Sequence, residues 1–174
     1  ANSGIAINSG GTITNNSGGI ITISNSGTRG IFNTGTLTNN SGATITVSNT
    51  GNSTGIQNFG TGTITNSGTI TVSNTGGDGI DNFSGGTLNN SGTITVSNTA
   101  GTGIANISGS TLNNNSGGII TISNTGGTGI SNSGTIANAG TIKHTFPSAT
   151  YSGAGTLTNS GSGKIALLGT ISAN

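Results

Sequence analysis

The chain has 174 residues and almost no charge: three Lys or Arg and two Asp make up 3% of it, against about 25% in an average globular protein. With a net charge of +1 it has no basic face that could neutralise phosphates. No apolar run approaches the roughly 20 residues that span a bilayer. The absence of cysteine excludes disulfides and zinc–thiolate sites. We therefore expect no nucleic-acid binding and no membrane insertion.

One motif returns every 24 to 26 residues along most of the chain. Its clearest copy, residues 79–102, reads GIDNFSGGTLNNSGTITVSNTAGT. A Gly-Ile pair opens each copy, and the isoleucines of these pairs are Ile5, Ile31, Ile56, Ile80, Ile104 and Ile130. A period of this length, filled with Gly, Asn, Ser and Thr, is typical of a stacked solenoid.

Each copy holds three short apolar segments in chain order. The Gly-Ile segment comes first, and a single Ile or Leu follows at Ile13, Leu37, Ile64, Leu88, Leu112 and Ile136. The third segment carries two apolar residues in a T-I-T-V pattern, as in Ile70 with Val72 and Ile94 with Val96. A spacing of two residues is strand alternation, and the N-S-G and N-T-G clusters between segments favour turns. No apolar stripe has helical spacing.

The pattern predicts an all-β, single-domain parallel β-solenoid over residues 1–174, with about seven coils, three short strands per coil and no helix. We expect it to be right-handed, as parallel β crossovers are. Regular coils should span about residues 4–142, an irregular insertion about 143–152, and a last coil 153–174. Tyr151 precedes Leu157 by six residues, as Ile130 precedes Ile136, so Tyr151 should fill the first apolar position of its coil.

Parallel stacking brings equivalent residues of successive coils together. The expected core columns contain Ile56, Ile80, Ile104, Leu88, Leu112, Ile70, Ile94, Val72, Val96, Phe59 and Phe83. Ile107 should continue the column of Phe59 and Phe83. Amide side chains stacked in this way can hydrogen-bond along the axis. We expect such a ladder from the Asn of each S-N sequence, at Asn25, Asn49, Asn74, Asn98 and Asn124.

A calcium motif occurs once. GGDGIDNFS, residues 76–84, fits the nonapeptide G-G-x-G-x-D-x-U-x of calcium-binding β-helices. Such sites need carboxylates from adjacent turns, yet the neighbouring copies place Gln57, Ala105 and Ser131 where Asp81 stands. Asp78 and Asp81 are the only metal candidates, and two carboxylates supply too few oxygen ligands. We expect neither a metal site nor a cofactor.

The chain offers little for catalysis. His144 aligns with the Val of the third segment but has no nearby acid or cysteine to form a triad or a metal cluster. Polysaccharide-cleaving β-helices need clustered carboxylates, and no acid exists apart from Asp78 and Asp81. We expect the protein not to be an enzyme.

Threonines recur in T-x-T pairs that should form outward columns. Thr44/Thr46, Thr69/Thr71 and Thr93/Thr95 form one set; a second set begins at Thr12/Thr14 and lapses to Thr87/Asn89. Flat Thr arrays resemble the ice-binding faces of solenoid antifreeze proteins. Thr also suits any exposed strand, so ice binding is an alternative hypothesis.

The segments GTLNNSGTITV, NSGTITNNSGG and ISNSGTIANAGTI resemble the passenger repeats of filamentous-haemagglutinin-like and autotransporter adhesins. The resemblance covers about residues 4–142. It implies a β-helical shaft at a bacterial surface or secreted from the cell, and it carries no catalytic residues across. One hypothesis is therefore a shaft segment of a large surface adhesin.

The ends of the repeat suggest assembly. Soluble solenoids need polar caps, because a bare end is an open strand edge. The repeat begins almost at once with Ile5 and Ile7, and the C-terminal KIALLGTIS contributes Leu167, Leu168 and Ile171. Head-to-tail stacking through these ends would give an open filament. We predict an extracellular fibre subunit whose partner is itself, serving matrix, adhesion or attachment to host or abiotic surfaces.

Overall fold

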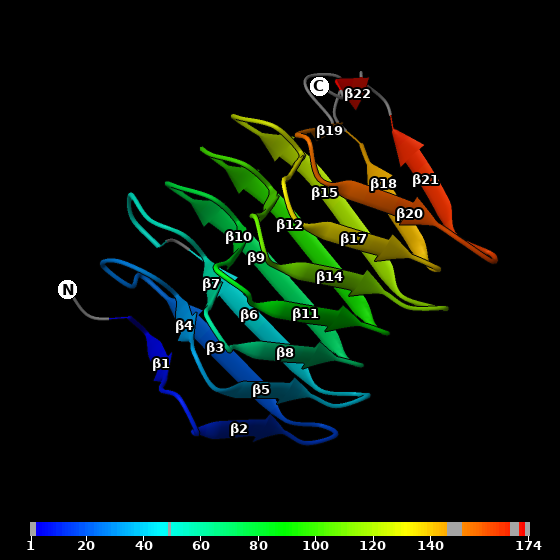
Figure 1. The fold of residues 1–174 in the computed structure, drawn as a ribbon. Coiled ribbons are helices and arrows are strands. Elements are labelled where there is room, and N and C mark those ends of the chain that lie inside the picture. The colour runs from blue at the N-terminus through cyan, green and yellow to red at the C-terminus, as the bar shows by residue number, and fades with distance from the viewer. Residues whose placement is uncertain (1–2, 49, 146–150, 168–170, 173–174) are drawn as a thin grey trace.

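Three parallel β-sheets run the length of the molecule. The structure is a computed structural model that describes residues 3–48, 50–145, 151–167 and 171–172. These residues form strands and turns but no helix. They therefore contain no long apolar helix that could cross a membrane. Each circuit of the chain adds one strand to each sheet, and successive circuits stack (Figure 1). The predicted β-solenoid is confirmed.

Sheet A contains the Gly-Ile segments. Its strands, in spatial order, are β1 (Ile5–Ile7), β4 (Ile31–Asn33), β7 (Ile56–Phe59), β10 (Ile80–Phe83), β13 (Ile104–Asn106), β16 (Ile130–Asn132), β19 (Tyr151–Ser152) and β22 (Ile171–Ser172). Ile130 pairs with Tyr151, which confirms that Tyr151 fills the first apolar position of its coil.

Sheets B and C contain the second and third segments. Sheet B consists of β2 (Thr12–Asn15), β5 (Thr36–Asn39), β8 (Thr63–Asn66), β11 (Thr87–Asn90), β14 (Thr111–Asn114), β17 (Thr135–Asn138) and β20 (Thr156–Asn159). Sheet C consists of β3 (Ile20–Ser24), β6 (Thr44–Ser48), β9 (Thr69–Thr75), β12 (Thr93–Thr99), β15 (Ile119–Thr125), β18 (Thr141–His144) and β21 (Lys164–Leu167). Each strand pairs with its equivalent one coil away.

The core is made of aliphatic columns between the three sheets. Leu88, Ile94, Val96 and Ile104 are each 0% exposed. The other aliphatic residues expected in the core are also buried: Ile56, Ile80, Leu112, Ile70 and Val72. Each apolar side chain of an interior coil lies between equivalent side chains of the coils on either side. The interior columns are therefore shielded from solvent along the axis as well as between the sheets.

The glycine of each Gly-Ile pair is required by close packing at the corner between sheets C and A. A Cβ on Gly79 would meet the side chain of Val96 and lie 2.6 Å from the Gly103 carbonyl oxygen of the next coil. The equivalent glycines Gly4, Gly30, Gly55 and Gly103 have the same surroundings. The constancy of the Gly-Ile pair is therefore steric.

The predicted core column of Phe59 and Phe83 lies outside the core. Phe59 is 37% exposed and Phe83 is half-buried, because each lies three residues after an inward Ile, and an odd spacing turns a strand side chain to the opposite face. Their rings do stack, with centroids 5.4 Å apart, but outside sheet A. Half-buried Ile107 follows at the next coil, where its backbone N–H donates to the Asn82 carbonyl.

The asparagines of the S-N sequences have a backbone role. Asn25, just after β3, and Asn74 and Asn98, one residue before the ends of β9 and β12, adopt positive φ angles of 56°, 52° and 51°. Asn tolerates this conformation better than most residues. Asn49 lies outside the described residues. The amide ladders described below run through other asparagines.

The predicted start of the irregular insertion, at about residue 143, also differs from the structure. Lys143 and His144, assigned to the irregular segment, belong to strand β18, where Ile122, His144 and Leu167 are successive members of one column. Residues 146–150, which include Pro147, lie outside the described part of the chain.

Candidate functional site

The N-terminal coil presents an apolar face along the solenoid axis. Ile5, Ile13 and Ile21 are half-buried, although their equivalents in the interior coils are 0–3% exposed. Ile7, expected at the assembly end, is 3% exposed. Among the described residues, the outer edges of β1, β2 and β3 have no strand partner.

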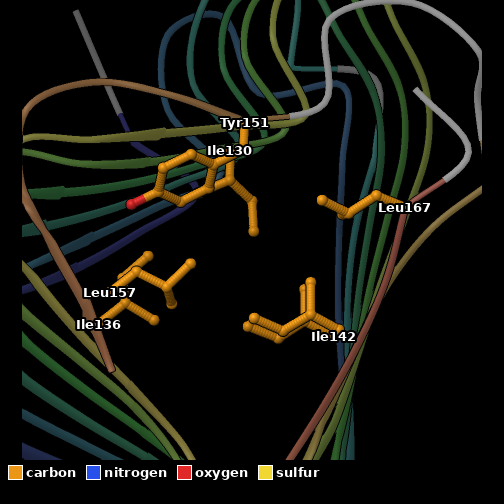
Figure 2. A pocket seen from close by; sticks show the side chains of 7 residues that line it. Ile130, Ile136, Ile142, Tyr151, Leu157 and Leu167 are labelled. Atoms are coloured by element: carbon orange, nitrogen blue, oxygen red, sulfur yellow. The ribbon is translucent and has the colours of Figure 1, made fainter. Parts of the chain in front are cut away.

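The C-terminal coil presents a second apolar face. Leu157, Ile165 and Leu167 are half-buried, and they line a pocket together with Ile130, Ile136, Ile142 and Tyr151. Figure 2 shows side chains from all three sheets turned toward this pocket, with the Tyr151 ring across one side. β20 and β21 are the outer strands of sheets B and C at this end, whereas β22 covers β19 in sheet A. Leu168 lies outside the described residues.

A hydrogen-bonded ladder of asparagines runs through sheet B from one end to the other. We call it the sheet-B ladder; its members are Asn15, Asn39, Asn66, Asn90, Asn114, Asn138 and Asn159. From Asn15 to Asn138, each Nδ2 donates to the Oδ1 of the next coil's Asn, over 2.7–3.0 Å. Every bond points toward the C-terminal coil, so the ladder has a polarity.

The sheet-B ladder is open at both ends of the described chain. No described residue donates to Asn15 Oδ1, and Asn159 Nδ2 donates only to the Gly163 carbonyl, at 2.9 Å. An interior member such as Asn138 donates to the next Asn and also to the Lys164 carbonyl of the next coil. One end therefore offers an acceptor and the other end an N–H donor.

A second ladder lies in sheet A, and the residue beyond each of its ends is not an asparagine. It runs through Asn33, Asn58, Asn82, Asn106 and Asn132, with Nδ2–Oδ1 distances of 2.7–2.9 Å. Asn132 Nδ2 donates to the Tyr151 hydroxyl at 2.9 Å, and Ile7 occupies the position before Asn33. Asn33 Oδ1 consequently accepts no hydrogen bond from the described chain. Of these two ladders, the sheet-B ladder is the one that can continue beyond the described chain.

The outer face of sheet A gathers three of the five charged side chains. Arg29 lies over the ring of Phe32, with its Cζ 4.9 Å from the ring centroid, and Phe32 lies 6.2 Å from Phe59 between centroids. Gln57 Nε2 donates to Asp81 Oδ2 at 2.8 Å. Burial raises the pKa of Asp81 and Asp78 adds to the rise, while Gln57 and Arg29 oppose it.

Both acids of the calcium motif accept hydrogen bonds from other residues of the chain. Asp78 Oδ1 accepts the Thr102 backbone N–H at 2.7 Å, and Asp81 is 9% exposed and bound to Gln57. Within the described ranges, no three His, Cys, Asp or Glu side chains lie where they could hold a metal ion. His144, 2% exposed, is in sheet C, away from both acids in sheet A and its preceding turn.

Threonine columns cover the outside of sheets B and C. The column that begins at Thr12 is unbroken through all seven strands of sheet B: Thr12, Thr36, Thr63, Thr87, Thr111, Thr135 and Thr156. In sheet C the column of Thr44, Thr69 and Thr93 is bounded by Ile20 and Ile119, which are 75% and 38% exposed. The longer Thr array is thus on sheet B.

No protein-family model and no curated protein matches the sequence. Among solved structures, the chain is similar to the crystal structure of a TibC-catalysed, hyperglycosylated fragment of TibA. The sequence identity is 19% and the TM-score 0.19, over 97% of this chain and 80% of that one. A similarity at this level does not identify a family.

Proposed function

We propose that the protein is a structural subunit of an extracellular filament, in which the C-terminal coil of one copy stacks on the N-terminal coil of the next. The main support for this proposal is that the strands of the two end coils have matching sequences. β2 reads Thr-Ile-Thr-Asn and β20 reads Thr-Leu-Thr-Asn, so β20 followed by β2 repeats the pairing already present between neighbouring coils.

Apolar burial supports the same arrangement. Stacking would cover Ile13 with Leu157 and Ile21 with Ile165, and these four side chains are half-buried in the single chain. Removing apolar surface from water stabilises an interface by about 25 cal/mol for each Å². A junction between unlike ends that advances each copy along the solenoid axis does not close on itself, and it therefore produces filaments rather than rings.

The function of such a filament is mechanical. Its surface carries few charges and many Thr, Ser and Asn side chains, and its backbone hydrogen bonds lie along the axis. We propose a role in matrix formation, adhesion or surface attachment. A shaft within a large surface adhesin would use the same coil-on-coil stacking inside one longer chain.

Negative-stain microscopy and sedimentation velocity of the purified chain test the filament. We expect unbranched rods much longer than one subunit, and a sedimenting fraction that grows with concentration. Particles of one subunit's mass at every concentration, both for this chain and for a variant with the C-terminal strand weakened, would contradict the proposal.

Ice binding is a second candidate, favoured by the unbroken seven-Thr column on sheet B. Against it, the neighbouring column changes from Thr65 to Asn89, Asn113 and Ala137. Thermal hysteresis of the chain in solution decides the matter, and the absence of hysteresis would remove this candidate.

A further inference from the structure

The strand β22 occupies the place that a second copy's β1 would need. In sheet A, β22 pairs with β19 so that Ile171 lies opposite Tyr151. The same column contains Ile5 of β1 at the other end of the sheet. Ile5 and Ile171 are thus equivalent positions, and both are the isoleucine that opens a coil.

The three sheets do not end in the same layer. Sheets B and C have seven strands each, whereas β22 gives sheet A an eighth (Figure 1). If β22 stayed in place and β1 of the next copy paired with β22, a layer would be missing between β20 and β2 and between β21 and β3. Strands in contact are about 4.8 Å apart, and one missing layer doubles that spacing, so sheets B and C would not join.

Given the head-to-tail stacking proposed above, we infer that β1 of the incoming copy displaces β22 and pairs with β19. The strands β2 and β3 of that copy then pair with β20 and β21. The junction becomes continuous in all three sheets, and β22 is a removable cover over the growing end.

The balance of strand pairing favours displacement. Within the described part of the chain, two residues of β22 pair with β19, Ile171 and Ser172. Between equivalent coils in the molecule, sheet B pairs four residues per strand, as in β2 with β5, and sheet C pairs at least four, as in β18 with β21. Displacement therefore gives up a two-residue pairing that β1 replaces, and it adds the pairing of two longer strands.

The sheet-B ladder fixes the direction and register of the junction. Asn159 Nδ2 would donate to Oδ1 of Asn15 in the incoming copy, as Asn138 donates to Asn159 at 2.7 Å. A head-to-head junction would place two Asn15 acceptors together, and a tail-to-tail junction would oppose two Asn159 donors. Buried polar groups left unpaired are costly, so the ladder selects head-to-tail growth.

Growth kinetics of the full chain, followed by light scattering with microscopy of the end point, test the displacement. Ile171→Asp should weaken β22, because Asp is disfavoured in strands, and we expect faster growth than in the wild type. Ile5→Asp should slow growth about tenfold or more, since it removes one apolar side chain from the junction. Ala6→Asp adds the same charge at the next, exposed position of β1 and should have a smaller effect. Circular dichroism confirms that each variant is folded.

The outcomes separate the two proposals. If the wild type forms filaments and Ile171→Asp grows more slowly or at the same rate, β22 is not displaced, and the displacement is overturned while the filament stands. If the wild type stays monomeric and Ile171→Asp forms filaments, β22 is shown to block the end. If neither chain assembles, the filament proposal fails and the displacement fails with it.

Discussion

Asparagine side chains inside the solenoid hold neighbouring coils together at the scale of single residues. Asn90, 0% exposed, donates to Asn114 Oδ1 at 2.8 Å and to the carbonyl of Ile119 at 3.2 Å. It also accepts from Asn66 at 2.8 Å. Each amide of the ladder is satisfied only while both adjacent coils are in place, so the ladder couples the stability of one coil to the next.

Replacing Asn90 with Ala should be severely destabilising. Each buried group left unpaired costs roughly 1–3 kcal/mol, and this change affects partners in both neighbouring coils, so we expect a loss of about 3 kcal/mol or more. Asn89→Thr is the matched control, because Asn89 points outward and the previous coil has Thr65 in its place. Asn89 Oδ1 accepts from Asn113 Nδ2 at 2.8 Å, but this pair is only partly buried, so the loss should stay at about 1 kcal/mol or less. Urea unfolding measures both, and equal losses would contradict a special role for the inner ladder.

The carboxyl of Asp81 should make stability depend on pH. Its pKa is raised by burial, so the folded chain binds this proton more tightly than the unfolded chain, in which an Asp has a pKa of about 3.9. Its stabilising contribution is present below that value and is lost as the pH rises through the folded pKa. Asp81→Asn keeps an acceptor for Gln57 and removes the titration.

Thermal melts between mildly acidic and neutral pH test this carboxyl. The melting temperature of Asp81→Asn should exceed that of the wild type by a margin that grows with pH from about 4 upward. A constant difference between the two chains over that range would show that Asp81 does not titrate abnormally.

At the scale of elements, the corner before each strand of sheet A leaves no room for a side chain. Gly79→Ala would force its Cβ against Val96 and the Gly103 carbonyl. Overpacking of this kind costs about 1–3 kcal/mol. In Gly27→Ala the added carbon meets nothing within 4 Å, and the unfolding free energy should change by no more than about 0.5 kcal/mol. Chemical denaturation of both variants checks this, and an equally mild Gly79→Ala would contradict the steric account.

The sequence predicted the strands and their register well, because the Gly-Ile, Ile or Leu and T-I-T-V positions recur in every coil. The buried ladders were missed although a signal existed: Asn15 lies two residues after Ile13, and Asn58 two after Ile56, a spacing that turns both side chains inward. The same parity argument would have placed Phe59 outside. At these positions strand alternation determines which face of the sheet a side chain occupies, whether that side chain is polar or apolar.

The candidate interface was only partly visible in the sequence. Ile5 and Ile7 marked one end and Leu167 and Ile171 the other. The sequence alone could not show that β22 pairs in register with Tyr151 or that sheet A extends one strand beyond its neighbours. In most earlier coils an S-N sequence follows the third segment before the next Ile, whereas Leu-Gly-Thr alone links Leu167 to Ile171, so the repeat pattern does not predict how β22 pairs.

At the scale of the whole molecule, the account requires that β20 of one copy pairs with β2 of the next. Adjacent parallel strands are about 4.8 Å apart, within the Cα separation that a disulfide bridges. Thr158 and Thr14 lie in one column, both exposed. The chain has no cysteine, so cysteines placed at these two positions would have no competing thiol. They lie on opposite edges of sheet B and cannot join within one copy.

The most direct measurement is therefore oxidation of the double variant Thr14→Cys, Thr158→Cys, followed by electrophoresis under non-reducing conditions. We predict a ladder of covalent multimers that reduction collapses to the monomer. Thr12→Cys with Thr158→Cys, two residues out of register, should give little or none. A double variant that stays monomeric, or equal cross-linking in both registers, would contradict head-to-tail stacking of the solenoid.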